Sequence, residues 1–190
     1  MPYKLQPCDV LLFYNEYTDV WNKIYRWGLE SPYTHVLMYL GQWAISRPST
    51  GSEVTIPMIY ESVGRGVITR PPFSYVGDKM MILRPYINDT QREQIVNNAL
   101  DIAFALNSYY DYLTFGNLAV ILALQKLHLH IPLAYQRNSS MICTECVAEP
   151  FWRAGLYPVS PNRAPIPSDF LNWPDCEKVG LLTVSPEMWE

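Results

Sequence analysis

The chain has 190 residues, enough for one well-buried domain and short for two, so we predict a single domain spanning 1–190. Its net charge is −4, and 17% of its residues are charged, against about 25% in typical globular proteins. The scattered lysines and arginines argue against a phosphate-binding face, so we expect no nucleic-acid partner. The low charge instead favours apolar surface covered by a lipid, a partner or a second copy in a homo-oligomer.

The sequence also bears on where the protein works. No apolar stretch reaches the roughly 20 residues of a membrane-spanning helix, and the N-terminus lacks an apolar core of signal-peptide length. The four cysteines are interpreted most simply as free thiols in a cytoplasmic protein, although a disulfide framework stays open. Peripheral contact with a membrane stays open as well.

The first half of the chain predicts mainly short strands. Val10–Tyr14 is the first strand, and a helix over 18–29 follows it, with Thr18 as the cap. The remaining strands are predicted at 35–40, 58–62, 66–69 and 79–83. Together they indicate an antiparallel sheet or a small barrel.

The second half predicts mainly helices. The segment 90–93, Thr-Gln-Arg-Glu, has the pattern of a capping box, and a helix with an apolar stripe follows it. A second helical segment covers 113–129, and a third opens at Cys143 and ends at Gly155. A proline-rich loop over 157–174 and a strand at 179–184 complete the chain. Because the helices follow the strands instead of alternating with them, the fold class is α+β, with the sheet or barrel packed against helices.

Cys143 is the strongest candidate for chemistry. Asn138, Ser139 and Ser140 offer N-cap side chains just before it, so the thiol is predicted in the first turn of a helix. The unpaired N–H groups and the positive dipole end of a helix favour a thiolate there and can hold a developing oxyanion. A nucleophilic site follows if a base lies within reach.

His35 is placed like that base, because it falls between a Ser-Pro turn signal and a β-rich run that ends at Gly41. Glu61 lies in a second short strand and can accept the other imidazole N–H, which would fix the tautomer. Each of the three residues also has a structural interpretation. A cysteine in an apolar helix is most often a small buried hydrophobe, and both His35 and Glu61 can be ordinary strand residues.

Four segments match, in order, the pattern of a known family. They are Cys8-Asp9-Val10-Leu11-Leu12-Phe13, Thr34-His35-Val36, Tyr60-Glu61-Ser62 and Cys143-Thr144-Glu145-Cys146-Val147. The chain thereby resembles the permuted NlpC-type, papain-like cysteine hydrolases, in particular the YiiX-like group, and more distantly lecithin retinol acyltransferase. Weaker matches are Tyr110-Asp111-Tyr112 and Pro167-Ser168-Asp169-Phe170.

The resemblance implies a circularly permuted papain-like fold, with Cys143 as nucleophile, His35 as base and Glu61 as the third polar residue. The order of His before Cys is the reverse of papain's. Three positions depart from the family pattern, with Thr144 for Ser, Cys146 for a bulky aliphatic residue and Cys8 for Gly. A long polar insert over 46–55 separates His35 from Glu61 and makes Glu61 the weakest assignment.

The activity implied is a thiol-dependent amidase or esterase that forms a thioester acyl-enzyme and passes the acyl group to water or an acceptor. Neither a metal nor an organic cofactor is expected. The substrate would be a small-molecule, lipid-like or peptide-like acyl compound, and the apolar composition tilts the expectation towards lipid. We expect the helical segment 113–129 to border the site and receive an acyl chain, with burial inside the core or a dimer as the alternative.

Three other interpretations stay open. Cys143 and Cys146 form a Cys-x-x-Cys pair, which is also typical of zinc sites and of thioredoxin-like redox sites. A zinc site would need further ligands from Cys8, Cys176, His128 or His130, and a redox site would need a preceding strand in a βαβ unit. The many tyrosines and tryptophans would also suit a non-catalytic binding module.

Overall fold

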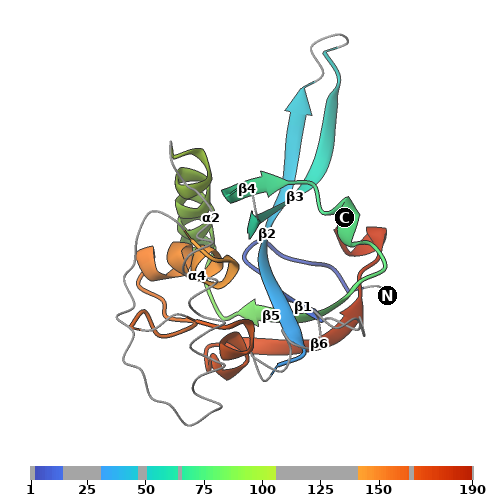
Figure 1. Cartoon of the computed structure of the whole chain (residues 1–190). Coiled ribbons are helices and arrows are strands. Elements are labelled where there is room, and N and C mark those ends of the chain that lie inside the picture. Colours follow the sequence, from blue (N-terminus) through green and yellow to red (C-terminus); the bar gives the residue numbers. More distant parts are fainter. Residues whose placement is uncertain are drawn as a thin grey trace.

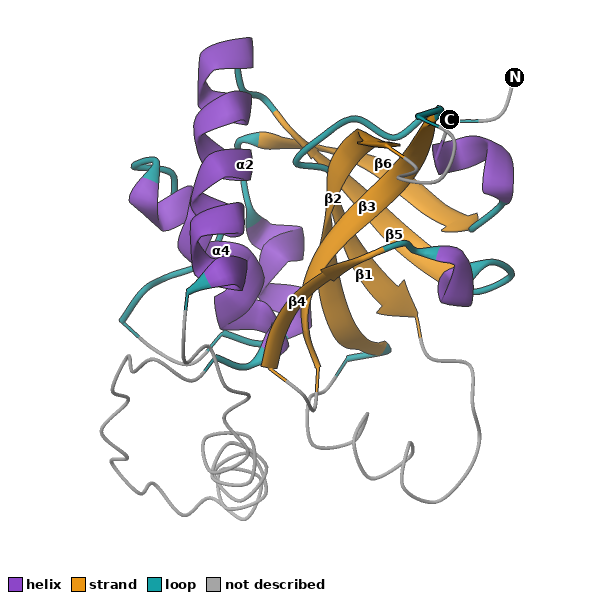
Figure 2. Ribbon diagram, turned by 90° about the horizontal axis from the view of Figure 1, so that it is seen from above, coloured by secondary structure: helices purple, strands orange, loops and turns teal. Residues whose placement is uncertain are grey.

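One antiparallel sheet of six strands organises the protein. The structure, a computed structural model, describes residues 3–14, 31–46, 51–63, 66–105, 141–162 and 165–189. The strand order is β4-β3-β2-β1-β5-β6, and every pairing is antiparallel. Figures 1 and 2 show α2 and α4 together on one side of this sheet. The elements are β1 Val10–Tyr14, β2 Tyr33–Ser46, β3 Glu53–Val63, β4 Gly66–Arg70, η1 Phe73–Tyr75, β5 Lys79–Pro85, α2 Asp89–Phe104, α4 Cys143–Arg153, η2 Pro167–Asn172, β6 Cys176–Thr183 and η3 Pro186–Trp189.

Both faces of the central strands are buried. Side chains alternate along a strand, so Val36 and Met38 of β2 join the apolar cluster that contains α4. Leu37 and Tyr39 join a second cluster on the other face, which Trp189 near the C-terminus helps to close. Coverage on both faces explains why β1 and β2 read as continuous apolar runs in the sequence.

The predicted α+β class and antiparallel sheet are confirmed. The first strand has the predicted bounds, and the other described strands are longer than predicted. The polar insert over 46–55 extends the hairpin of β2 and β3, which pair as far as Ser46 opposite Glu53. Figure 1 shows this hairpin projecting from the body of the sheet. Because the extension lies at the end of β2 far from His35, it leaves the neighbourhood of His35 and Glu61 intact.

The start of α2 and the capping residue of α4 differ from the prediction, whereas α4 begins at Cys143 as predicted. Asn88 caps α2, and its side chain and that of Gln91 form the capping box, so the helix begins ahead of the box predicted at 90–93. Ile142 occupies the N-cap of α4 without a side-chain hydrogen bond, in place of the three polar candidates before it. The helices predicted over 18–29 and 113–129 lie outside the described residues.

The Cys8–Asp9 turn joins the N-terminal segment to the sheet. Cys8 has a φ of 72° and donates its N–H to the Tyr39 carbonyl at 2.7 Å. This left-handed conformation favours glycine, which is the residue that the resembling family carries here. Asp9 is fully buried and ion-paired with Arg84, whose Nη2 lies 2.7 Å from Oδ2. Removal of Arg84 would leave a buried carboxylate uncompensated.

Two glycine substitutions test how closely the chain packs at the bulge between Tyr39 and Gly41. Gly41 has a φ of +100°, and a Cβ there would lie 3.0 Å from Pro7 Cγ. Gly77 has a φ of +96° with nothing within 4 Å of its Cβ position. A substitution there therefore changes the free energy of unfolding through backbone strain alone. We expect Gly77→Ala to lower the free energy of unfolding by about 1 kcal/mol and Gly41→Ala by about 2 kcal/mol or more. Urea unfolding measures both, and equal losses would show that the Pro7 contact does not matter.

Candidate active site

Cys143 is the first residue of α4, a helix buried along almost its whole length against β2, β3 and α2. Three hydrogen bonds fix this end of the helix. Ser62 Oγ donates to the Met141 carbonyl at 2.7 Å, and Thr144 Oγ1 donates to the Pro165 carbonyl at 2.7 Å. The Glu145 carboxylate accepts the N–H of Ile142 at 3.0 Å. The first N–H groups of a helix have no partner within it, so the backbone beside Cys143 offers donors to an anion.

His35 reaches Cys143 from the start of β2. Phe13 pairs with His35 and Tyr14 with Tyr33, which leaves Thr34 as the extra residue of a bulge directly before the histidine. The imidazole lies close enough to Cys143 for the thiol to raise its pKa, and its side chain keeps 21% of its surface exposed. Its Nε2 lies 2.8 Å from Glu61 Oε2. With Nε2 engaged by Glu61, Nδ1 is the nitrogen left for the thiol.

Glu61 is fully buried on β3 and accepts three hydrogen bonds. In addition to His35, Tyr75 Oη donates to Oε2 at 2.6 Å and Arg70 Nε donates to Oε1 at 2.5 Å. A buried carboxylate is costly unless its oxygens are paired, and here both oxygens are. The carboxylate is therefore held in one orientation by three different elements, β2, β4 and η1.

Electrostatic interactions within the site shift the pKa values of His35 and Glu61 so that the charged form of each is favoured. Burial opposes protonation of His35, but the hydrogen bond and charge of Cys143, followed by those of Glu61, outweigh it and raise the pKa of His35 to about 10. Burial would raise the pKa of Glu61, but its donors, with His35 first, lower it to about 2. The arrangement thus favours an imidazolium at His35 beside the ionised carboxylate of Glu61.

The structure brings together the three predicted residues Cys143, His35 and Glu61 from a helix and two strands. Sequence reasoning missed Arg70 and Tyr75. Arg70 lies one residue past the predicted end of its strand, and Tyr75 lies in a short turn with no strand or helix pattern, so only the fold shows that both point at Glu61.

Cys146 lies one turn after Cys143 and is fully buried in the core. Burial raises its pKa well above the ordinary value, and the lowering effect of the nearby Tyr60 is too small to offset this. All four cysteines are free thiols. The redox interpretation required a parallel βαβ unit, and the described sheet contains only antiparallel pairings.

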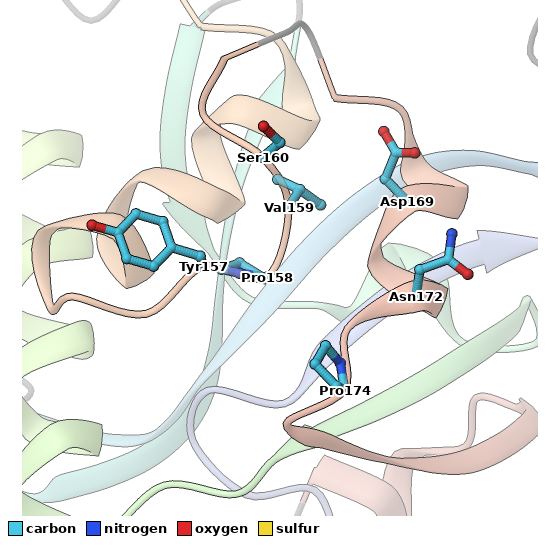
Figure 3. A pocket seen from close by; sticks show the side chains of 7 residues that line it. All are labelled: Tyr157, Pro158, Val159, Ser160, Asp169, Asn172 and Pro174. Atoms are coloured by element: carbon cyan, nitrogen blue, oxygen red, sulfur yellow. The ribbon is translucent and has the colours of Figure 1, made fainter.

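A separate pocket of about 260 Å³ lies between the segment that follows α4 and η2 (Figure 3). Part of the predicted loop over 157–174 thus forms η2, where Asp169 Oδ2 accepts the N–H of Ile166 at 2.9 Å. The three candidate site residues are not among those that line the pocket, which are Tyr157, Pro158, Val159, Ser160, Asp169, Asn172 and Pro174.

Comparison with known proteins gives a fold. No protein-family profile and no curated protein sequence matches the chain. Among solved structures, the chain is similar to metalloprotein YiiX from Escherichia coli O157:H7, with a TM-score of 0.60 and 14% sequence identity over 94% of this chain and 98% of that one. The chain has a YiiX-like fold. At this identity the likeness concerns the fold alone.

The described residues do not fit a metal ion. Over the parts of the chain that the structure describes, no group of three His, Cys, Asp or Glu side chains is arranged so that it could hold one. Both oxygens of Glu61 already accept hydrogen bonds, and Cys8 and Cys176 direct their thiols to the carbonyls of Arg92 and Trp173. His128 and His130 lie outside the described residues. We therefore derive no chemistry through a metal.

The described residues also contain no helix long and apolar enough to cross a membrane.

The buried carboxylate predicts an acid-dependent contribution to stability. The pKa of Glu61 is about 2 in the folded protein against an ordinary value of 4.5, so its contribution is present above pH 4.5 and is lost as the pH falls towards 2. We expect the difference in free energy of unfolding between wild type and Glu61→Gln to narrow over this interval, by up to about 1.4 kcal/mol per pH unit. Urea unfolding at several pH values measures it, with Glu93→Gln as the control for loss of an exposed carboxylate. A stability difference between wild type and Glu61→Gln that does not change with pH would contradict the lowered pKa of Glu61.

Proposed function

We propose that the protein is a cysteine hydrolase or acyltransferase that cleaves an ester or amide through a thioester acyl-enzyme. The observation that carries this proposal is the chain of contacts from Cys143 at the start of α4, through His35, to the buried carboxylate of Glu61. A purely structural cysteine needs no base, and a structural histidine needs no second buried charge. The combination is the one that activates a thiol.

Each residue then has a defined role. His35 Nδ1 takes the thiol proton, and Cys143 Sγ attacks the carbonyl carbon of the substrate. The N–H groups at the start of α4 bind the oxyanion, and His35 returns its proton to the departing alcohol or amine. Water or another acceptor, deprotonated by His35, attacks the thioester, releases the acyl product and restores the thiol. Glu61 stays ionised and stabilises the imidazolium throughout.

The YiiX-like fold and the order of the motifs support placing this chain among the permuted NlpC-type, papain-like hydrolases, with lecithin retinol acyltransferase as a more distant relative. Within that proposal the substrate is a small lipid-like or peptide-like acyl compound, and the protein works in the cytoplasm. The segment 113–129, proposed to receive an acyl chain, lies outside the described residues. Fold analogy alone does not choose the substrate.

The nucleophile is tested by thiol alkylation. An ordinary thiol is only a few per cent ionised at neutral pH. We expect iodoacetamide to label Cys143 fastest, and His35→Ala to slow this labelling by roughly tenfold or more. Peptide mapping by mass spectrometry gives the rate for each cysteine.

Cys8, Cys146 and Cys176 are internal controls for this experiment, because all three are buried and their pKa values are raised, mainly by burial. If Cys143 reacts no faster than they do, a non-catalytic binding module on the same fold becomes the better explanation.

Metal content separates the proposal from a metalloprotein role such as the one named for YiiX. We expect the purified protein to contain no stoichiometric metal, and EDTA to leave both the Cys143 alkylation rate and the melting temperature unchanged. Elemental analysis provides the first measurement. A tightly bound ion whose removal accelerates Cys143 alkylation would instead assign the thiol to a metal site.

A further inference from the structure

Glu61 has more hydrogen-bond donors than the proposed reaction requires, and the two extra donors come from different elements. Arg70 lies on β4, and Tyr75 lies in η1 between β4 and β5. Arg70 Nη1 also donates to Ser74 Oγ at 2.7 Å, and its guanidinium lies 5.1 Å from the centre of the Tyr75 ring. The two donors therefore support each other as well as Glu61.

The number of donors constrains the proton positions. Arg70 keeps its charge at any relevant pH and can only donate. Burial and the charge of Glu61 raise the pKa of Tyr75, so its hydroxyl also keeps its proton and donates. A proton on Glu61 would point at the hydrogens of these donors, so the hydrogen bonds could not form. With the carboxylate ionised, the nitrogen of His35 that faces it must carry hydrogen.

We infer that Arg70 and Tyr75 are positioning residues that hold Glu61 as an anion and thereby set the tautomer of His35, turning Nε2–H to Glu61 and leaving Nδ1 for Cys143. This inference rests on the proposed function and adds two positioning residues to its site. The titratable and charged groups that act on Glu61 and His35 include Cys143 of α4, Arg70 of β4 and Tyr75 of η1, and Cys146 of α4 also interacts with Glu61 and Cys143.

The test is the pH dependence of Cys143 alkylation. Tyr75→Phe and Arg70→Gln each remove one donor, so the buried carboxyl of Glu61 should protonate at higher pH and stop supporting the imidazolium. We expect the acid limb of the alkylation rate to move up by about one pH unit in each variant, about a tenfold slower reaction on that limb, with a nearly unchanged plateau. Arg70→Lys keeps the charge and should restore part of the shift.

Tyr39→Phe is the matched control. It also removes a buried tyrosine hydroxyl, but that hydroxyl donates to the Trp189 carbonyl at 3.0 Å and not to Glu61. A general loss of stability would lower the melting temperature in all these variants without moving the acid limb. Acid limbs of Tyr75→Phe and Arg70→Gln that superimpose on the wild type would overturn the inference.

A second measurement does not depend on these variants or on Cys143 reactivity. In ¹⁵N-histidine-labelled Cys143→Ala, at a pH above the titration of His35, the nitrogen shifts should report hydrogen on Nε2 and a bare Nδ1. The opposite tautomer would overturn the inference. Slow alkylation of Cys143 in the wild type would count against the proposed function, while the tautomer would still decide the role of Arg70 and Tyr75.

Discussion

The buried carboxylate of Glu61 is the constraint around which the candidate site is arranged. A charge with no exposed surface is stable only when its oxygens are fully hydrogen-bonded, so β2, β4 and η1 must each deliver a donor to it. That requirement fixes the position of the His35 ring, and the ring in turn meets the thiol at the start of α4. Displacement of any one of these elements would leave an unpaired group in the interior.

The two faces of the sheet explain how the residues come together. Because side chains alternate along a strand, Glu61 lies on the same face of the sheet as Ile59, which belongs to the cluster closed by Trp189. Cys143 belongs to the other cluster, on the helix side of the sheet. The start of β2 is where the two sides meet, because the bulge at Thr34 interrupts the regular pairing directly before His35. Ser62 points the other way from Glu61 and binds the carbonyl of Met141, two residues before α4. One strand thus holds both the carboxylate and the helix start.

The structural likeness to YiiX supports the fold of the chain, whereas the residues of the site support the proposed chemistry. The structural likeness at 14% identity establishes how the chain is folded, and it leaves the chemistry to the residues of this chain. Those residues offer a thiol, an imidazole and an ionised carboxylate in contact, while the carboxylate oxygens that a metal would need are already occupied by hydrogen bonds. For this reason we assign the proposed chemistry to the thiol, although YiiX is described as a metalloprotein.

The sequence by itself determined the α+β class, the approximate positions of the described strands, and the candidates Cys143, His35 and Glu61, because local periodicity and turn residues act over a few neighbours. It misplaced the start of α2 and the capping residue of α4, since several polar residues in a row satisfy the same capping pattern and only packing selects one. It gave no indication of Arg70 and Tyr75. Only the tertiary structure decided that these two side chains converge on Glu61, because a hydrogen bond between residues of different elements depends on strand order and register, which no local pattern encodes.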